Sequence, residues 1–449
     1  MIRLFGTDGI RGVANIFPMT PEMMVKIGMA LGAIIADHQT HVIIGRDTRR
    51  SGQMLEYALS SGLTAVGASV LLTGILPTPA VAFLTRKWQA HAGIVISASH
   101  NPAQDNGVKI FSSTGFKLPD DLETRIEQIV LDEQTTHARP TGADIGIIKP
   151  VMEAAEEYAE HIIQSVFAEM KPDFSKMKIV VDCANGAASF LAPSILKYLQ
   201  ANVIEMAVEP DGLNINQQCG ALHTKQLCER VLQEQAQIGI AFDGDADRLI
   251  LVDEYGRQVD GDHILAMLAL DLRQKGRLQR NTLVATVMSN LGLEVAMKDA
   301  GIQFVRVAVG DRHVVEKMRE IGANIGGEQS GHIILFEHGT TGDGIASALT
   351  VLKLLQERGK PLSELATCMT TFPQTLINVP VKTRKPIEEM VRVSEAIRQA
   401  EKELGDRGRT LVRYSGTELL ARVMVEAENE ATVNRIAEMI VSELQKENT

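Results

Sequence analysis

One pattern occurs three times along this chain: an apolar, β-branched stretch, a polar or glycine-bearing turn, a segment with helical periodicity and a second apolar stretch. Strands that alternate with helices in this way indicate βαβ units and mainly parallel sheets. The expected strand, helix and strand lie at residues 42–45, 51–66 and 68–72, at 178–182, 187–199 and 203–206, and at 283–286, 291–300 and 303–307. We therefore expect an α/β fold with three similar domains, each built on a mainly parallel, mixed sheet.

The last part of the chain has a different pattern, which is typical of a compact α+β domain. Strands are expected at 375–381, 410–414 and 421–426, and helices at 386–404 and 430–446. With 449 residues the chain is too long for one core. Gly and Pro residues near Pro140 and a hairpin signal at Asp253–Gly256 mark further boundaries. The predicted domains are 1–150, 151–255, 256–370 and 371–449, packed together around shared clefts, where ligands often bind.

Ser99 follows an apolar, strand-like stretch in the segment Ile94-Val-Ile-Ser-Ala-Ser-His-Asn-Pro102. The Asn101-Pro102 pair favours an extended or turn conformation, so we expect Ser99 on a tight loop at the carboxyl edge of a sheet. Open α/β folds bind their ligands at that edge. With a histidine beside it, Ser99 is a candidate nucleophile, and an ordinary turn is the alternative on this segment alone.

Three aspartates stand at alternate positions in Phe242-Asp-Gly-Asp-Ala-Asp-Arg248. Two like unit charges at about 4 Å cost on the order of 4 kcal/mol at an effective dielectric of 20, so the three carboxylates need a cation. Oxygen ligands favour a hard ion, Mg²⁺ first. The alternatives are a solvated acidic turn and an EF-hand. The EF-hand is disfavoured, because Arg248 stands where that loop needs glycine and apolar, strand-like runs flank the loop.

Two glycine-bearing segments supply further candidate ligands. Gly326-Gly-Glu-Gln-Ser-Gly-His332 could direct hydrogen-bonding groups at a polyhydroxylated ligand, with a plain glycine turn as the alternative. Arg413-Tyr-Ser-Gly-Thr-Glu418 could form a phosphate nest, to which Arg422 adds a second guanidinium, with a β-turn as the alternative. No nucleotide-binding glycine motif occurs, so the phosphate is not expected to belong to a nucleotide.

Composition excludes several classes of function. The net charge of −11, one Trp and five Tyr argue against a nucleic-acid partner. The four cysteines show no C-x-x-C spacing, which favours reduced thiols over zinc ligands or disulfides. No apolar run approaches the roughly 20 residues that a membrane span needs, and no signal peptide precedes the first charges. A soluble cytoplasmic protein with no membrane partner is therefore expected.

Taken together and in this order, the four segments resemble the α-D-phosphohexomutase superfamily over essentially the whole chain. Phe5-Gly-Thr-Asp-Gly-Ile-Arg-Gly12 and Gly327-Glu-Gln-Ser-Gly-His332 are similar to the corresponding segments of bacterial members that act on glucosamine phosphate. The resemblance implies an isomerase with four domains around a central cleft, one Mg²⁺ per subunit and a hexosamine phosphate substrate. It leaves a homodimer open.

The resemblance also implies roles for individual residues. Ser99 would carry a phosphoryl group, and this phosphoserine would hold Mg²⁺ together with Asp243, Asp245 and Asp247. The positions implied in acid–base catalysis or charge stabilisation are His100, Lys109, Arg11 and Arg248. The positions implied in substrate binding are Glu328, Ser330, His332, Arg413, Ser415, Gly416, Thr417 and Arg422. His313 is assigned no role.

The implied reaction passes the phosphoryl group of Ser99 to glucosamine 6-phosphate. The resulting glucosamine 1,6-bisphosphate reorients and returns its 6-phosphoryl group, leaving glucosamine 1-phosphate for UDP-N-acetylglucosamine and cell-wall precursors. Phosphoryl transfer needs positioning, a metal ion and positive side chains, which these segments would supply. The alternatives are a mutase for glucose or mannose phosphate, a Mg²⁺-dependent sugar phosphatase and a non-catalytic sugar-phosphate-binding protein.

Overall fold

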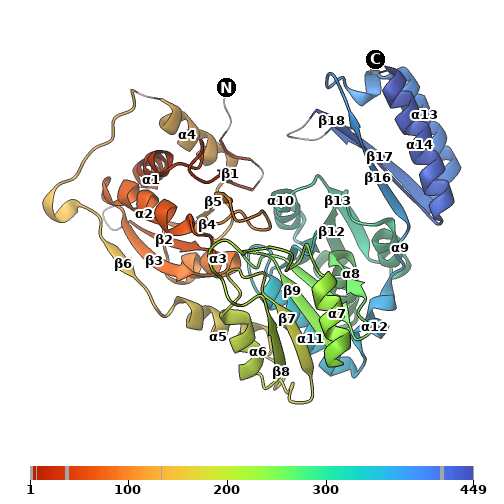
Figure 1. Ribbon diagram of the computed structural model, residues 1–449, viewed down its shortest axis with the longest axis horizontal. Coiled ribbons are helices and arrows are strands. Elements are labelled where there is room, and N and C mark those ends of the chain that lie inside the picture. Colours follow the sequence, from red (N-terminus) through yellow and green to blue (C-terminus); the bar gives the residue numbers. More distant parts are fainter. Residues whose placement is uncertain (1–3, 7, 36–39, 133, 415–418, 448–449) are drawn as a thin grey trace. The chain divides into compact units, whose positions relative to one another are not determined.

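The computed structural model of the chain describes residues 4–6, 8–35, 40–132, 134–414 and 419–447. The chain forms two compact units, which we describe separately (Figure 1). Unit 1 comprises Met1–Met288 and Gln303–Thr367, and unit 2 comprises Ser289–Ile302 and Cys368–Thr449. The described residues of unit 1 contain three mixed α/β sheets, and those of unit 2 contain a small antiparallel sheet with helices, so the expected α/β class is confirmed.

The first sheet of unit 1 has the strand order β1-β5-β4-β2-β3-β6. Its strands are β1 (Ile10–Val13), β2 (His41–Arg46), β3 (Ser69–Ile75), β4 (Ala92–Ile96), β5 (Asp105–Ser112) and β6 (Ile148–Pro150), and the helices between them are α1 (Pro21–Ile35), α2 (Gly52–Thr64), α3 (Thr78–Lys87) and α4 (Asp120–Leu131). Strand β2 runs parallel to β3 and β4, whereas β5 runs antiparallel to β1 and β4. The parallel core of this sheet is what the strand–helix–strand pattern predicts.

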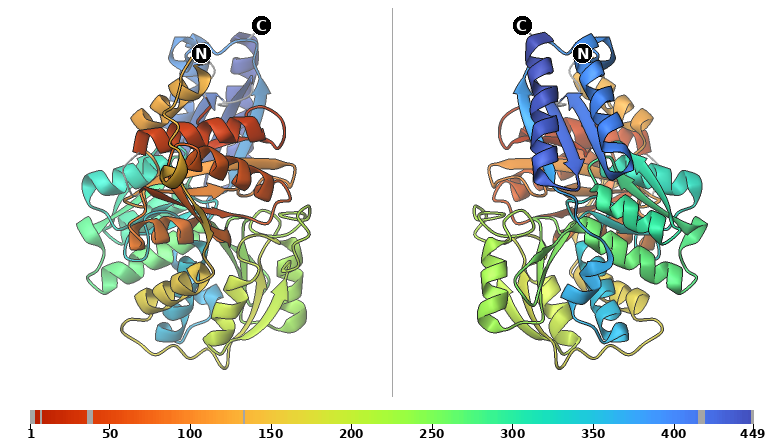
Figure 2. Two further views of the ribbon diagram at one scale, coloured as in Figure 1. Left: turned by 90° about the vertical axis from the view of Figure 1, so that its left-hand side faces the viewer. Right: turned by 90° about the vertical axis from the view of Figure 1, so that its right-hand side faces the viewer.

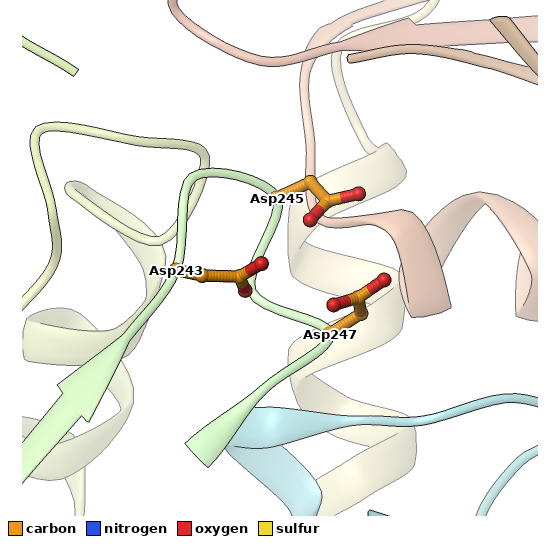
Figure 3. Close-up of side chains that lie close together, drawn as sticks. All are labelled: Asp243, Asp245 and Asp247. Carbon is orange, nitrogen blue, oxygen red and sulfur yellow. The ribbon is translucent and has the colours of Figure 1, made fainter. Parts of the chain in front are cut away.

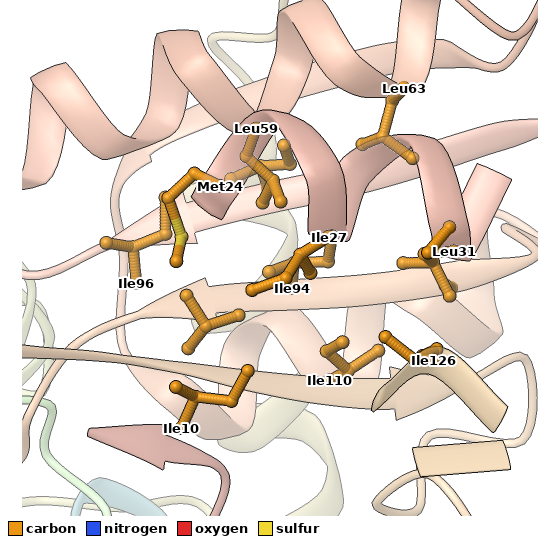
Figure 4. Packing of buried hydrophobic residues seen from close by; sticks show 14 of the residues in the cluster. Ile10, Met24, Ile27, Leu31, Leu59, Leu63, Ile94, Ile96, Ile110 and Ile126 are labelled. Atoms are coloured by element: carbon orange, nitrogen blue, oxygen red, sulfur yellow. The ribbon is translucent and has the colours of Figure 1, made fainter. Parts of the chain in front are cut away.

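Apolar side chains hold α1 and α2 against this sheet. Ile27 and Leu31 of α1 and Leu59 and Leu63 of α2 are spaced four residues apart, so each pair lies on one helix face. Figure 4 shows these residues packed beside Ile94 of β4, and all five are fully buried. Burial of each such side chain stabilises the fold by about 1.5 to 3 kcal/mol. This core fixes the sheet whose carboxyl edge carries Ser99.

The second and third sheets of unit 1 have the strand orders β11-β10-β9-β7-β8 and β13-β12-β14-β15. Their strands are β7 (Lys178–Asp182), β8 (Asn202–Met206), β9 (Ile238–Phe242), β10 (Leu249–Asp253), β11 (Gln258–Val259), β12 (Thr282–Thr286), β13 (Gln303–Val307), β14 (Ile325–Gly327) and β15 (Ile333–Leu335). The accompanying helices are α5 (Ala154–Val166), α6 (Leu191–Tyr198), α7 (Lys225–Glu234), α8 (Gly261–Gln274), α10 (Asp311–Ile321), α11 (Gly344–Arg358) and α12 (Leu362–Leu365). Strands β7 and β12 are central and parallel to both neighbours, while β9–β10 and β14–β15 are antiparallel hairpins.

Helix α6 begins at Leu191, four residues later than the pattern predicts. The preceding residues form a turn in which Ala184 and Asn185 have φ values of 54° and 48°. The backbone N–H of Ala187 donates to the carbonyl oxygen of Gly244, 2.8 Å away. Because of this tertiary contact, the first residues of the expected helix form a turn instead.

Unit 2 contains the antiparallel strands β16 (Gln374–Pro380), β17 (Gly408–Tyr414) and β18 (Leu420–Ala427), in the order β16-β18-β17. Helices α13 (Val391–Leu404) and α14 (Glu430–Glu447) lie side by side against this sheet (Figure 2). Helix α9 (Leu291–Asp299) also belongs to this unit, although it lies between β12 and β13 in the sequence. The N–H of Leu291 donates to the buried carboxylate of Glu426 on β18, 3.1 Å away.

Two expectations drawn from composition can be compared with the structure. The four cysteines all lie among the described residues and are free. In the described part of the chain, no helix combines the length and the apolar character that crossing a membrane requires.

Candidate active site

Ser99 lies on the loop of residues 97–104 between β4 and β5, which we call the Ser99 loop. It is 1% exposed, and its φ of 51° is in the left-handed region. Its Oγ donates to Asp243 Oδ2, 2.5 Å away, and lies 3.2 Å from His100 Nδ1. The neighbouring hydroxyl of Ser97 instead donates to Asp47 Oδ2 at 2.6 Å. Of the two serines, Ser99 therefore has its hydroxyl beside the aspartate cluster.

The Asp loop (residues 243–248) connects β9 to β10 and carries the three predicted metal ligands. Figure 3 shows Asp243, Asp245 and Asp247 projecting from this one loop with their carboxylates close together. All three are buried, and one oxygen of each lies within 4.8 Å of the others. Oδ1 of Asp245 and Oδ1 of Asp247 are buried without a hydrogen bond. A set of buried carboxylate oxygens with remaining acceptor capacity fits a hard cation such as Mg²⁺.

The Asp loop and the Ser99 loop touch through Gly244. A Cβ atom at this position would lie 2.5 Å from the carbonyl oxygen of Ser99, closer than any side chain allows. Burial raises the pKa of Asp243 well above its usual value, and the charges of Asp247 and Asp245 raise it further. The close packing thus makes three charged carboxylates beside the Ser99 hydroxyl unfavourable unless a cation neutralises them.

Positive side chains from the first sheet surround these carboxylates. Lys109 of β5 is 2% exposed, and its Nζ donates to Asp245 Oδ2 at 2.9 Å and to Asp247 Oδ2 at 2.8 Å. Burial lowers the pKa of Lys109, but the charges of Asp245 and Asp247 outweigh it and place the pKa well above its usual value. Arg11 of β1 donates from Nη1 to the carbonyl oxygen of Ala98 at 3.3 Å.

Two further predicted residues lie beside this cluster. The backbone N–H of Arg248 donates to Asp243 Oδ1 at 3.2 Å, and its Nε is 4.0 Å from Asp247 Oδ1. Burial lowers the pKa of His100 to about 4, and the charges of Arg248 and Arg11 contribute. His100 therefore presents a neutral imidazole next to the Ser99 hydroxyl.

The Glu328 loop (residues 328–332) connects β14 to β15, as the glycine-rich segment predicts. Gly331 has a φ of 93°, and a Cβ atom there would lie 2.2 Å from the carbonyl oxygen of Leu249. Leu249 in turn donates its N–H to the carbonyl oxygen of Gly331 at 2.9 Å. This contact joins the Glu328 loop to β10. Ser330 Oγ donates to Glu328 Oε2 at 3.4 Å, and Glu328 Oε1 accepts from the N–H of Gly310 at 3.2 Å.

His332 lies between two carboxylates. Its Nδ1 is 3.6 Å from Asp247 Oδ1, and its Nε2 is 3.5 Å from Asp311 Oδ2. Burial lowers the pKa of His332, but the charges of Asp247 and Asp311 outweigh it and raise the pKa to about 9. Among the described residues implied in substrate binding, His332 therefore lies beside a predicted metal ligand, Asp247.

His332 belongs to a closed ring of six residues with alternating charge. Lys117 Nζ donates to Asp311 Oδ1 at 2.6 Å and to Asp8 Oδ1 at 2.5 Å, and Asp8 Oδ2 is 3.4 Å from Lys109 Nζ. In order, the ring runs through Asp247, His332, Asp311, Lys117, Asp8 and Lys109, and Lys109 contacts Asp247 again. When His332 is protonated, each member thus contacts two groups of opposite sign, whereas the neutral imidazole accepts from the N–H of Gly342 at Nε2, 3.1 Å away.

The sequence motifs do not single out Asp8, Lys117 and Asp311. Asp8 lies in the segment that carries the family resemblance, and Asp311 lies in Gly310-Asp-Arg-His313, so both stand in recognisable motifs without an assigned role. His313, the residue considered there, is 41% exposed at its side chain and lies 3.9 Å from Glu316 on its own helix. The motifs also pass over Asp47, Arg49 and Asn216, which contact the Ser99 loop.

The remaining predicted residues lie in unit 2. Arg413 of β17 and Arg422 of β18 are directly opposite each other in the antiparallel register. Burial lowers the pKa of Arg413, and the charge of Arg422 lowers it further. Two facing guanidinium groups favour an anion between them. Ser415, Gly416 and Thr417 lie outside the described residues.

Four successive regions of the chain match the parts of one protein family. The phosphoglucomutase/phosphomannomutase alpha/beta/alpha domains I, II and III match residues 2–137, 156–256 and 260–372, and the C-terminal domain of that family matches residues 376–443. A solved structure of a phosphoglucomutase/phosphomannomutase family protein from Burkholderia thailandensis has a TM-score of 0.81 and 25% identity, covering 100% of this chain and 98% of that one. The N-acetylphosphoglucosamine mutase of Aspergillus fumigatus shares the fold, with a TM-score of 0.67, 18% identity and coverage of 100% and 96%.

Full-length relatives are considerably more similar in sequence. The phosphoglucosamine mutase of Anaeromyxobacter sp. is 51% identical over 450 residues, which cover 99% of this chain and 96% of the relative. That of Thermoanaerobacter pseudethanolicus is 49% identical over 451 residues, with 99% of both chains covered. The resemblance drawn from the sequence motifs is confirmed. The chain belongs to the phosphoglucomutase/phosphomannomutase family, and the two full-length relatives at about 50% identity described here are phosphoglucosamine mutases.

Proposed function

We propose that this isomerase interconverts glucosamine 6-phosphate and glucosamine 1-phosphate, with Ser99 as the phosphoryl carrier and glucosamine 1,6-bisphosphate as the intermediate. The observation that carries the proposal is the buried Ser99 hydroxyl, 2.5 Å from Asp243 Oδ2 and adjacent to two more carboxylates. A hydroxyl in this position is next to a cation site and to positive side chains, the groups that phosphoryl transfer requires. The names of the full-length relatives support glucosamine as the sugar.

The aspartates and the phosphoserine would hold Mg²⁺. Asp243, Asp245 and Asp247 supply hard oxygen ligands, and the phosphate on Ser99 would complete the set. When bound, Mg²⁺ neutralises negative charge on the transferring phosphoryl group. Lys109 and Arg11 contribute further positive charge from β5 and β1.

The reaction consists of two successive phosphoryl transfers. In the first, the 1-hydroxyl oxygen of glucosamine 6-phosphate forms a bond to phosphorus as the bond from phosphorus to Ser99 Oγ breaks. The 1-hydroxyl loses its proton and Ser99 Oγ regains one. In the second, Ser99 Oγ loses its proton and bonds to the phosphorus of the 6-phosphoryl group as the bond from that phosphorus to oxygen 6 breaks, and oxygen 6 takes up a proton. We expect His100 to exchange the Ser99 proton, because its Nδ1 is 3.2 Å from Oγ.

Two sets of residues are proposed to bind the substrate. Glu328, Ser330 and His332 would bind the sugar hydroxyls, since they lie on one glycine-rich loop that contacts β10. Arg413 and Arg422 would bind the phosphate that is not transferred, together with Ser415, Gly416 and Thr417. The Ser99 loop, the Asp loop, the Glu328 loop and the segment that begins at Arg413 would each belong to one proposed domain. In the same order, these domains are 1–150, 151–255, 256–370 and 371–449.

The test compares wild type and Ser99→Ala with glucosamine, glucose and mannose 6-phosphates, in the presence of Mg²⁺ and a trace of the bisphosphate. Glucosamine 6-phosphate is expected to have the highest kcat/KM, and Ser99→Ala is expected to lose more than about 1,000-fold in activity, because the covalent carrier is gone. Ser194→Ala, at an exposed position on α6, is the matched control and should retain wild-type activity.

Three outcomes would contradict the proposal. Stoichiometric release of inorganic phosphate identifies a phosphatase. Sugar-phosphate binding with neither turnover nor phosphate on Ser99 identifies a binding protein. A higher kcat/KM with glucose or mannose 6-phosphate identifies a different mutase of the same family.

A further inference from the structure

Ser99 has an unusual backbone conformation for a residue that would repeatedly gain and lose a phosphoryl group. Its φ of 51° lies in the left-handed region, which residues other than glycine rarely adopt. Such a conformation persists only where the surrounding structure holds it. The question is therefore what holds the backbone N–H and C=O groups of Ser99.

Two side chains from different sheets donate to the same carbonyl oxygens of the Ser99 loop. Arg49 Nη2 lies 3.0 Å from the carbonyl oxygen of Ser99 and 2.8 Å from that of Asn101. Asn216 Nδ2 lies 2.8 and 3.0 Å from these two oxygens. Arg49 follows β2 of the first sheet, whereas Asn216 follows β8 of the second. Each carbonyl oxygen thus accepts two hydrogen bonds, which uses both of its lone pairs.

The Arg49 guanidinium is itself fixed in place. It is 1% exposed, its Nε donates to Asp47 Oδ2 at 2.8 Å, and its Nη1 donates to the carbonyl oxygens of Asp105, at 3.0 Å, and Pro102. A buried cation is tolerated only where it is paired and hydrogen-bonded. The planar fork of arginine then fixes the direction of every bond that it makes.

The same ion pair also reaches the amide side of Ser99. Asp47 Oδ2 accepts from Ser97 Oγ at 2.6 Å, and Ser97 Oγ accepts from the backbone N–H of Ser99 at 2.9 Å. Asp47 and Ser97 are fully buried. The N–H and the C=O of Ser99 are therefore both connected to the Asp47–Arg49 pair.

We propose that Asp47, Arg49, Ser97 and Asn216 are positioning residues for phosphoryl transfer at Ser99. Their hydrogen bonds go to the backbone of the Ser99 loop, so they act through its conformation and fix the direction in which Oγ leaves the loop toward the Asp loop. The inference rests on the proposed function, because a positioning role requires Ser99 to carry the phosphoryl group.

The test uses two variants with matched controls. Asn216→Ala removes both donors that come from the second sheet, and Arg49→Lys keeps the charge but removes the planar fork. Asn214→Ala is the control for the first variant, since its amide donates to Glu209 on its own loop. Arg50→Lys, at the adjacent exposed position, is the control for the second.

The positioning role predicts a loss in kcat at nearly constant KM. A misplacement of about 1 Å costs on the order of 100-fold in rate, so kcat is expected to fall about 10- to 100-fold in Asn216→Ala and further in Arg49→Lys. KM for glucosamine 6-phosphate should stay within about twofold of wild type, because these residues act through Ser99 and not through the substrate. The ³¹P resonance of phospho-Ser99 should shift or broaden in both variants and in neither control.

The proposal is overturned if both variants retain the kcat and the ³¹P resonance of their controls. It is also overturned if the loss of activity only follows a lowered thermal midpoint, or if KM rises as much as kcat falls, since either result indicates a structural role alone. If Arg49→Lys fails to fold, the same measurements on Asn216→Ala and Ser97→Ala test the proposal. Ser97→Ala removes the acceptor of the Ser99 N–H. Wild-type activity in Ser99→Ala would instead count against the proposed function itself.

Discussion

At the scale of single residues, Gly331 determines where the Glu328 loop lies. Its positive φ disfavours any residue with a side chain, and a Cβ atom would lie 2.2 Å from a carbonyl oxygen of β10. The loop approaches the start of β10 closely only because this position is glycine. A methyl group here forces the Glu328 loop away from β10.

We therefore expect Gly331→Ala to raise KM for glucosamine 6-phosphate at least about tenfold and to lower the thermal midpoint. Gly276→Ala is the control, because its φ is 68° but a Cβ atom there would meet nothing within 4 Å. It should lose about 1 kcal/mol from backbone strain alone and retain its KM. Equal KM values for the two variants would show that the close approach of Gly331 is unimportant for binding.

Whether a site residue can be predicted from the sequence depends on how far its hydrogen-bond partners lie along the chain. Ser99 and the three aspartates could be identified because each lies in a short motif with its own chemistry. Arg49 and Asn216 could not, since they contact the Ser99 carbonyl across 50 and 117 positions. The backbone oxygens that Arg49 binds on the Ser99 loop leave no pattern in the sequence, because any loop offers such oxygens.

At the scale of elements, α11 begins at a buried carboxylate. Asp343, 6% exposed, accepts from the N–H of Ala346 at 2.9 Å and from the Tyr158 hydroxyl of α5 at 2.9 and 2.8 Å. Burial raises its pKa to about 6. The native state therefore binds more protons than the unfolded state between pH 3.8 and about 6, so the contribution of Asp343 to stability falls as pH rises through this window.

Asp343→Asn should remove this pH dependence while keeping the N-cap, since asparagine caps a helix as well as aspartate does. The variant should match wild type near pH 4 and be more stable near pH 7. The two-unit pKa shift sets an upper limit of about 3 kcal/mol on the gain, or several degrees in thermal midpoint. Thermal unfolding across pH 4 to 7 provides the measurement, with the exposed Asp144→Asn as control. A constant difference between variant and wild type would contradict the assignment.

The elements themselves follow closely from hydrophobic pattern. The β7, β9 and β12 strands are predicted because buried parallel strands are continuous apolar runs. The start of α6 was predicted wrongly, since residues 187–190 have helical composition but form a turn against Gly244. A contact with a loop that lies about 60 residues away outweighs local preference there.

At the scale of the whole molecule, the charge ring connects three sheets through side chains. Asp8 and Lys109 come from the first sheet region, Asp247 from the second, and His332 and Asp311 from the third. The sequence motifs identified Lys109, Asp247 and His332, whereas Asp8, Lys117 and Asp311 were not singled out, because their partners in the ring are distant in the sequence. Removing one charge leaves its two neighbours in the ring with an unbalanced charge.

The Asp loop is expected to make the stability of unit 1 depend on Mg²⁺. A ligand that binds only the native state at 100 times its Kd adds about 2.7 kcal/mol, so Mg²⁺ should raise the thermal midpoint by several degrees and EDTA should reverse the change. Asp245→Asn should lose most of this response, whereas the exposed Asp173→Asn should keep it. An equal response in Asp245→Asn would exclude the Asp loop as the cation site.

The position of helix α9 in the sequence limits where the chain can be truncated. The helix is encoded between β12 and β13 but has its hydrogen-bonded partner, Glu426, near the end of the chain. A stop codon after residue 367 would therefore remove β18 and leave the N–H of Leu291 without its acceptor. The last part of the chain is thus not a detachable module, and a separate unit 2 would require residues 289–302 to be rejoined to it by a linker.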